Sequence, residues 1–176
     1  MSQYLVRKMK SNLQKIEEHL TQIESNRSPK ETISLLGRAI RYLSYRDHSE
    51  VELIKKLKPH ADSDEQLQVT LQKLMDKQYL SNERFADSFI SRKSKNFGMN
   101  RLSQEMRQHQ LSQPIIQKQL QELKTTEFER AFAVWEKKFG SVATEQRDLA
   151  KQMRFLVSRG FDLEIVYRIV RGKTPD

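Results

Sequence analysis

The residues able to bind a metal ion or act as nucleophiles are few and scattered. The four histidines, His19, His48, His60 and His109, include no pair at the i, i+3 or i+4 spacing with which one helix holds a metal. Cysteine is absent, which removes thiolate nucleophiles, disulfides and sulfur-ligated zinc. The sequence also has no glycine-rich phosphate loop and no G-x-S-x-G motif. We therefore expect a protein that is not an enzyme and uses no cofactor.

Acidic residues occur in short groups that ordinary helix chemistry explains. Glu17 and Glu18 are typical of a solvated helix face. Residues 62–65, Asp-Ser-Asp-Glu, resemble part of a metal loop but lack the glycine of a calcium loop. Ser63 followed by Gln66 is instead a capping pattern, in which a hydroxyl accepts from an otherwise unpaired amide at a helix start. His48 also precedes a helix start, and we expect it to be exposed.

Basic residues give the stronger signal. The chain has 32 Lys and Arg against 23 Asp and Glu, a net charge of +9, and residues 81–124 hold eight basic and four acidic residues. Lysine and arginine bind phosphates and release counterions, so such binding depends on salt and not on sequence. We predict a contact surface for an anionic partner, although a merely solvated basic face is the alternative. Its candidate residues are Arg84, Arg92, Lys93, Lys95, Arg101 and Arg107 around the Phe97-Gly98 turn, together with Lys55 and Lys56.

Helices must position these residues. Five glycines and four prolines are too few for the turns of an all-β sandwich, and 36% hydrophobic residues indicate an extended molecule with little interior. Apolar residues recur three or four positions apart almost from end to end, first over 4–23 and again from 34 onward. No apolar stretch is long enough for a signal peptide or a membrane span, so we expect a cytoplasmic protein without membrane contact.

Caps and breaks divide the pattern into helices. Ser49 is expected to cap a helix that stops near Pro59, and Gly98 to be the left-handed cap that closes the helix containing Phe85. Asn100 would cap the next helix. The helices after it are bounded by Pro114 in a first turn and by Gly140 and Gly160 at helix ends.

The helices fall into a repeat. Leu57, Met106 and Leu156 stand in register at steps of 49 and 50 residues, which is typical of stacked modules. We predict an all-α fold of three tandem three-helix modules in an extended, curved array, with an additional N-terminal helix. The expected parts are 1–33 for the N-terminal helix and linker, and 34–80, 81–124 and 125–176 for the modules. Three unrelated helical hairpins are the alternative.

Several segments resemble the RecX family of bacterial regulators of the RecA recombinase. Residues 42–53 (YLSYRDHSEVEL) resemble its first module, and 79–86 (YLSNERFA), with Gly98 and the helix of Arg101 to Met106, resemble its second. Residues 156–161 (LVSRGF) resemble its late Arg-Gly-Phe signature. The matched positions, mainly structural ones, are Arg46, Ser49, Glu52, Leu53, Leu57, Phe85, Gly98, Arg159, Gly160 and Phe161.

The resemblance implies a monomeric protein that lies in the groove of the helical RecA–DNA filament. It would hinder recombinase, ATPase and co-protease activity in DNA repair, recombination and the SOS response, with single- and double-stranded DNA as further partners. The chain departs from the family at Gln78 and Gln110, where glycine is usual, and at Ser81 and Asn82, where acids are usual. A left-handed cap without glycine costs about 1 kcal/mol more, so we expect the junctions near 78 and 110 to differ.

Other readings stay open. Arg46 and Arg159 would cap helices or form an ion pair between modules, or else contact a partner. Four aromatic residues have the spacing of core positions, although such rings also stack on bases: Phe132, Trp135, Phe155 and Phe161. The rival function is a protein that binds DNA alone. A weaker one is an adaptor whose short N-terminal stripe pairs as a coiled coil.

Overall fold

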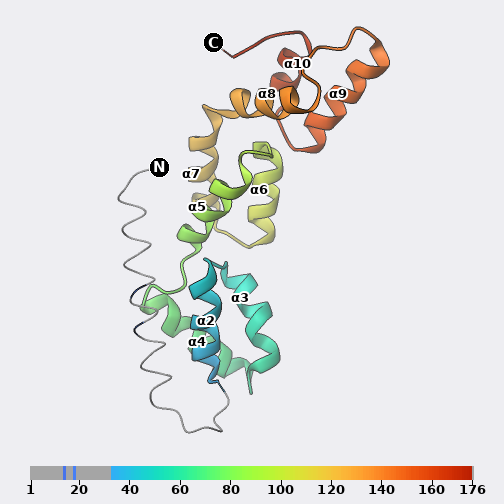
Figure 1. Ribbon diagram of the computed structural model, residues 1–176. Helices are drawn as coiled ribbons and strands as arrows, with labels where there is room; N and C mark the ends of the chain where they lie inside the picture. Colours follow the sequence, from blue (N-terminus) through green and yellow to red (C-terminus); the bar gives the residue numbers. More distant parts are fainter. Residues whose placement is uncertain (1–13, 15–17, 19–32, 176) are drawn as a thin grey trace. The chain divides into compact units, whose positions relative to one another are not determined.

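The computed structural model describes residues 14, 18 and 33–175 of the chain, and in this part every regular element is a helix. The chain divides into two compact units, one ending at Phe85 and the other beginning at Ala86 (Figure 1). Apart from Gln14 and Glu18, the predicted helix over 4–23 and the linker at Pro29 lie outside the described residues. No described helix has the length and apolar character of a membrane span.

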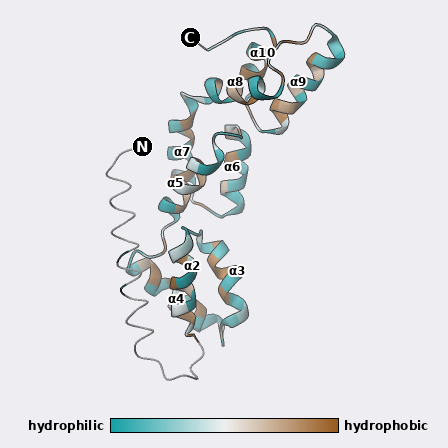
Figure 2. Ribbon diagram, viewed as in Figure 1, coloured by the Kyte–Doolittle hydropathy of each residue, from teal (hydrophilic) through white to brown (hydrophobic). Residues whose placement is uncertain are grey.

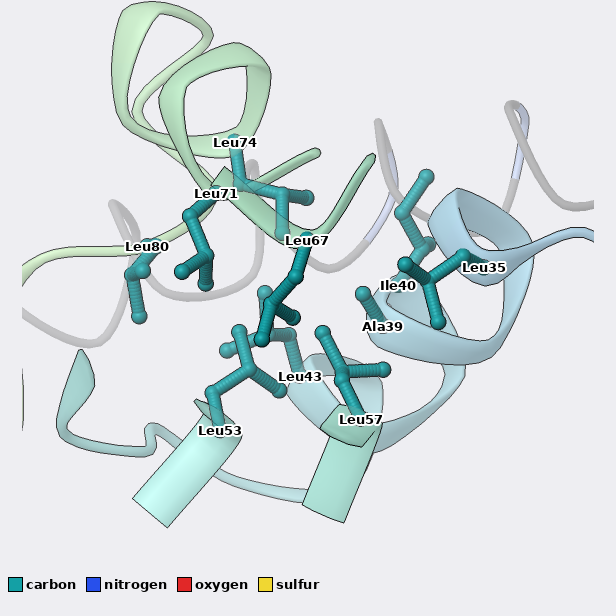
Figure 3. Packing of buried hydrophobic residues seen from close by; sticks show 10 residues of the cluster. All are labelled: Leu35, Ala39, Ile40, Leu43, Leu53, Leu57, Leu67, Leu71, Leu74 and Leu80. Atoms are coloured by element: carbon teal, nitrogen blue, oxygen red, sulfur yellow. The ribbon is translucent and has the colours of Figure 1, made fainter. Parts of the chain in front are cut away.

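The first unit contains helices α2 (Leu35–Tyr45), α3 (Glu50–Leu57) and α4 (Asp64–Asp76), with a short 3-10 turn at Lys58–His60. The three helices pack on one another. Leucines from all three meet in one core, shown in Figure 3, where Leu53 and Leu57 are fully buried. This core explains the spacing of three and four, because it places each apolar side chain on the inward face of its helix.

Serine hydroxyls begin these helices as predicted. The Ser49 hydroxyl accepts from the Glu52 amide at 3.2 Å, and the Ser63 hydroxyl accepts from the Gln66 amide at 3.1 Å. The Gln66 side chain also bonds Asp62, donating from Nε2 to its carboxylate and accepting from its amide, both at 2.9 Å. Capping therefore accounts for the acidic group at 62–65.

His48 is buried, so the prediction that it would be exposed is wrong. Only 4% of the residue is accessible, its ring lies 6.4 Å from that of Tyr42, and Nδ1 lies 2.9 Å from the Arg46 carbonyl oxygen. Burial lowers the pKa of His48, with a further contribution from the Arg46 charge, against the opposing effect of the carbonyl hydrogen bond. The ring thus fills space between α2 and α3 in its neutral form.

The second unit holds most of α5 (Asn82–Lys93), which begins in the first unit, and the following five helices. These are α6 (Met99–Gln108), α7 (Gln113–Lys124), α8 (Glu127–Lys138), α9 (Gln146–Ser158) and α10 (Leu163–Val170). α6 packs on α7, and α8, α9 and α10 pack on one another. Hydrophobic residues alternate with hydrophilic ones along these helices (Figure 2). The described chain confirms the all-α fold with three tandem three-helix modules.

Four aromatic residues of the third module belong to its core. Trp135 and Phe161 are buried, while Phe132 and Phe155 are half-buried and pack against the same cluster. The Trp135 indole N–H donates to the Gln152 side chain at 3.0 Å, which satisfies its polar atom inside the core. The prediction of core positions is confirmed for these four residues.

Gln78 and Gln110 keep the left-handed conformation for which glycine is usual, with φ of 58° and 55°. Beyond Gln110, the Leu111 amide donates to the Met106 carbonyl at 3.2 Å, and the Gln110 amide donates to Arg107 at 2.9 Å. This pair of bonds is the Schellman motif. The expectation that the junctions near 78 and 110 would differ is therefore wrong, because these bonds hold each turn despite the cost of the side chain.

Gly98 begins α6 as its N-cap with φ −80°, so the prediction of a left-handed cap is wrong, and α5 already ends at Lys93. The residue is a glycine for another reason. A Cβ there would lie 2.3 Å from the Gly160 carbonyl oxygen and from the backbone of Phe161. Two backbones thus touch where α6 begins and α9 has ended. Asn100 lies inside α6 and does not cap it.

Hydrogen bonds close this contact, which we call the glycine joint: Gly98, Met99 and Asn100 with Glu127, Arg159 and Gly160. The Gly98 amide donates to the Arg159 carbonyl at 2.9 Å, and the Asn100 amide to the Gly160 carbonyl at 3.1 Å. Between them, the Met99 amide donates to the Glu127 carboxylate at 2.9 Å. The amides at the start of α6 are thereby paired with groups of the third module.

Glycine at the two left-handed positions should stabilise the protein. We expect Gln78→Gly and Gln110→Gly each to raise the free energy of unfolding by about 0.5–1 kcal/mol, because glycine has no Cβ penalty there. Gln104→Gly, an exposed change inside α6, should lower it by about 1 kcal/mol. Urea unfolding measures all three, and equal signs for the two kinds of site would contradict the assignment.

Gly98→Ala should destabilise the second unit more than Gly172→Ala does. Gly172 has φ +81° but nothing within 4 Å of an added Cβ, so alanine there meets only backbone strain of about 1 kcal/mol. Alanine at Gly98 adopts φ freely but collides with backbone, at a cost of about 1–3 kcal/mol. Thermal unfolding compares them, and amide exchange at Asn100 reports the joint. The reverse order of stabilities would show that close contact does not select Gly98.

Acidification should weaken the first unit through His48. Burial holds the pKa of His48 in the folded protein below the ordinary 6.5. As the pH falls below 6.5, the unfolded chain therefore binds a proton before the folded protein does, and the free energy of unfolding decreases. We expect the fall in unfolding free energy between pH 7.5 and 5.5 to be smaller in His48→Gln than in the parent protein. His60→Gln, at an exposed ring, is the control and should leave the pH dependence intact.

Candidate functional site

Two predicted basic residues converge on one carboxylate in the second module. Lys93, in the last turn of α5, and Arg101, in the first turns of α6, both pair with Glu105. Burial alone would raise the pKa of Glu105, but the hydrogen bonds and charges of Lys93 and Arg101 outweigh it and hold that pKa below its ordinary value. The three groups together keep one net positive charge.

Aromatic rings hold the same two cations in place. The Arg101 guanidinium lies 4.1 Å from the centre of the Phe97 ring, and Lys93 Nζ lies 4.9 Å from that of Phe89. Such contacts stabilise a cation by roughly 0.5–1 kcal/mol at exposed sites. Because each head group is oriented by a ring and a carboxylate, these side chains lose less freedom when a ligand binds.

Three further cations of the module are free to meet a partner. Arg92, Lys95 and Arg107 are exposed, and within the described residues none has a carboxylate partner. Arg92 and Arg107 stand in the last turns of α5 and α6, while Lys95 follows α5. Together with Lys93 and Arg101 they form what we call the basic surface.

The remaining predicted contact residues belong to the first unit. Lys55 and Lys56 are exposed in the last turn of α3, and Lys56 Nζ lies 4.9 Å from the centre of the Tyr42 ring. The Arg84 guanidinium is already bound within the protein. It donates to the carbonyls of Gln78 at 2.7 Å and Tyr79 at 2.9 Å, and pairs with Asp47 at 3.4 Å.

Sequence reasoning missed Arg130, which repeats the arrangement of Arg84 one module later. Arg130 donates to the carbonyls of Ser94 at 2.8 Å, Phe97 at 3.0 Å and Leu123 at 3.2 Å. Each arginine stands near the start of a module's first helix. It joins the loop between the first two helices of the preceding module to the end of that module's third helix or to the turn just after it. The signal in the sequence was the 46-residue spacing of Arg84 and Arg130, close to the repeat.

Glu127 was also missed, and it too has a counterpart. It is the first residue of α8 and accepts from the first amide of α6, just as the first residue of α5, Asn82, accepts from the Glu50 amide of α3 at 3.1 Å. Burial raises the pKa of Glu127, although its backbone hydrogen bond from Met99 and the charge of Arg130 oppose the rise. Burial likewise lowers the pKa of Arg130.

The family-motif arginines have local structural contacts. Arg46 Nη1 pairs with Glu52 at 2.8 Å, joining the end of α2 to the start of α3 within one module. The Arg159 guanidinium lies 3.8 Å from the centre of the Phe155 ring, while its carbonyl enters the glycine joint. Among the described residues, no group of His, Asp and Glu side chains is placed to hold a metal ion.

Sequence models of the three RecX domains match this chain in order. The first three-helix domain of RecX matches residues 36–74, the second 81–120 and the third 125–170. The regulatory protein RecX of Ralstonia pickettii strain 12J is 42% identical over 144 residues, which cover 82% of this chain and 91% of that protein. That of Pseudomonas putida strain GB-1 is 33% identical over 146 residues, covering 82% and 94%.

Solved structures agree with these matches. A crystal structure of regulatory protein RecX is similar with a TM-score of 0.67 and 26% identity, covering 79% of this chain and 70% of that one. The crystal structure of RecX from Lactobacillus salivarius, at 20% identity, shares the fold with a TM-score of 0.64, covering 78% and 92%. The matched domains include every residue of the basic surface and of the glycine joint. The chain belongs to the RecX family of regulatory proteins.

Proposed function

We propose that this protein binds the RecA–DNA filament through the basic surface and restrains the filament's recombinase, ATPase and co-protease activities. The observation that supports this is a set of exposed cations in the second module, Arg92, Lys95 and Arg107, which have no carboxylate partner among the described residues. Family membership supplies RecA as the partner. The protein would act in the cytoplasm as a monomer, in DNA repair, recombination and the SOS response.

The proposed mechanism is a mechanical block. Tandem modules laid in the filament groove bridge neighbouring RecA subunits and oppose their rearrangement, which requires neither a cofactor nor a chemical step. Lysine and arginine side chains meet DNA phosphates or acidic RecA side chains, and the released counterions make the binding dependent on salt. Lys55 and Lys56 would extend the contact to the first module.

The rival function is binding to DNA alone, and stoichiometry separates the two. RecA ATP hydrolysis on single-stranded DNA is measured while the protein is added below the amount that saturates the DNA. Inhibition at a low ratio of protein to RecA supports filament binding. Inhibition that starts only when the DNA is coated supports the rival and contradicts the proposal.

Removing three cations of the basic surface should weaken the inhibition. We expect the triple variant Arg92→Ala, Lys93→Ala, Lys95→Ala to need much more protein for half-inhibition and to show a log–log salt dependence of binding that is shallower by about 2. The matched control replaces Arg147, Lys151 and Arg154, exposed on α9, with alanine. The control removes the same charge, so an equal loss in both variants would show that net charge, not this surface, is responsible.

A further inference from the structure

A hollow of about 250 Å³ lies on the outward side of α2 in the first unit. It is lined by Ile33, Arg38, Arg41, Tyr42 and Tyr45. The last four recur at spacings of three, one and three residues along α2 and so form one stripe of the helix. The buried core residues of α2 occupy other positions, and of this stripe only Tyr42 packs against the core of the module.

The hollow is lined by two arginines, and no described residue supplies a counterion to it. Within the described residues, Arg38 Nε is buried without a hydrogen-bond partner, and no carboxylate lines the hollow. The guanidinium of Arg41 is exposed and makes no ion pair in the described part of the chain. A buried N–H donor without an acceptor is unfavourable, and an anionic ligand with oxygen acceptors would satisfy this donor.

An unoccupied aromatic ring stands beside the two arginines. Tyr45 is 73% exposed, the highest fraction among the large hydrophobic residues of the described chain. Tyr42 differs, because Lys56 lies over its ring and His48 packs beside it. Tyr42 therefore forms a fixed wall, while the Tyr45 ring offers its faces to a planar partner.

Size limits the class of ligand. A hollow of about 250 Å³ is smaller than the usual site for a cofactor or a drug-sized molecule. It has room for a phosphate and the atoms next to it, with the base left outside against the ring. An acidic peptide would satisfy the arginines but would have no use for the exposed ring.

We propose that this hollow binds one nucleotide of single-stranded DNA. Arg38 and Arg41 bind the phosphate, and Tyr45 stacks on the unpaired base, as aromatic platforms do in single-strand binding proteins. The inference rests on the proposed contact with DNA and adds to it a second site, outside the basic surface, that selects single strands. Duplex DNA offers the phosphates but no free base face.

The aromatic contact is tested with full-length protein and a fluorescent oligothymidylate, by anisotropy. Tyr45→Ala should weaken binding about five- to tenfold, since stacking accounts for a substantial part of the affinity per base. Tyr45→Phe should retain the affinity, and Tyr45→Leu should not, which separates stacking from simple apolar contact. Binding to duplex DNA of the same length should change by less than twofold in all three.

The phosphate contact has a different readout. Arg41→Gln and Arg38→Gln should each reduce the log–log salt slope of oligothymidylate binding by about 0.7, whereas Tyr45→Ala should leave the slope unchanged. Lys73→Gln and Lys77→Gln, exposed at the end of α4, remove the same charge from the same unit and should leave the slope as it is. Arg38→Gln should not lower the melting temperature of the free protein, because it removes an unsatisfied donor.

Two results would overturn the site. One is unchanged oligothymidylate affinity together with unchanged RecA inhibition in both Tyr45→Ala and Arg41→Gln. The other is weaker RecA inhibition in these variants with unchanged DNA affinity, which would assign the hollow to a protein partner. Either result leaves the proposed function standing if the basic-surface variant still loses inhibition, so the two proposals fail separately.

Discussion

Three consecutive amides at the start of α6 hold the second and third modules together, and the basic surface depends on them. Gly98, Met99 and Asn100 all donate to acceptors of the third module, two of them carbonyls that follow α9 and one the Glu127 carboxylate. The backbones approach so closely that only glycine fits at positions 98 and 160. A helix start normally leaves its amides to solvent or to a local cap. Here these amides donate to the neighbouring module. Their hydrogen bonds fix the beginning of the helix that carries Arg101 and Arg107.

Arg84 and Arg130 make similar contacts, and so do Asn82 and Glu127. Arg84 and Arg130 each join the loop between a module's first two helices to the end of its third helix or to the turn just after it. Asn82 and Glu127 each accept from the first amide of the module's second helix. Multiple hydrogen bonds from one guanidinium make this possible, because its five donors can reach several carbonyls at once. A chain with 36% hydrophobic residues thus supplements small cores with polar contacts.

Charge in this protein divides between structure and surface. Arg46, Arg84 and Arg130 are bound to internal acceptors, and Lys93 and Arg101 share Glu105. Arg92, Lys95 and Arg107 remain exposed in the second module, and Arg38 and Arg41 line the hollow on α2. The net charge of +9 is therefore not spread evenly over the folded surface. Part of the positive charge is bound inside the protein, and the cations left for a partner are gathered in two places. Both sets of free cations point to phosphate as the ligand group they would bind.

The sequence by itself determined the all-α fold, the three tandem three-helix modules, the serine caps at 49 and 63 and the core positions of Trp135 and Phe161, because these follow from local periodicity and from hydrogen bonds a few residues apart. It also carried the family resemblance. Only the tertiary structure decided that His48 is buried, that Gln78 and Gln110 keep left-handed turns, and that Gly98 serves a contact and not a turn. Only the tertiary structure shows which arginines are bound to internal acceptors and which are exposed. These features depend on atoms brought together from segments far apart in the chain, and side-chain spacing along one helix carries no record of what lies across from it.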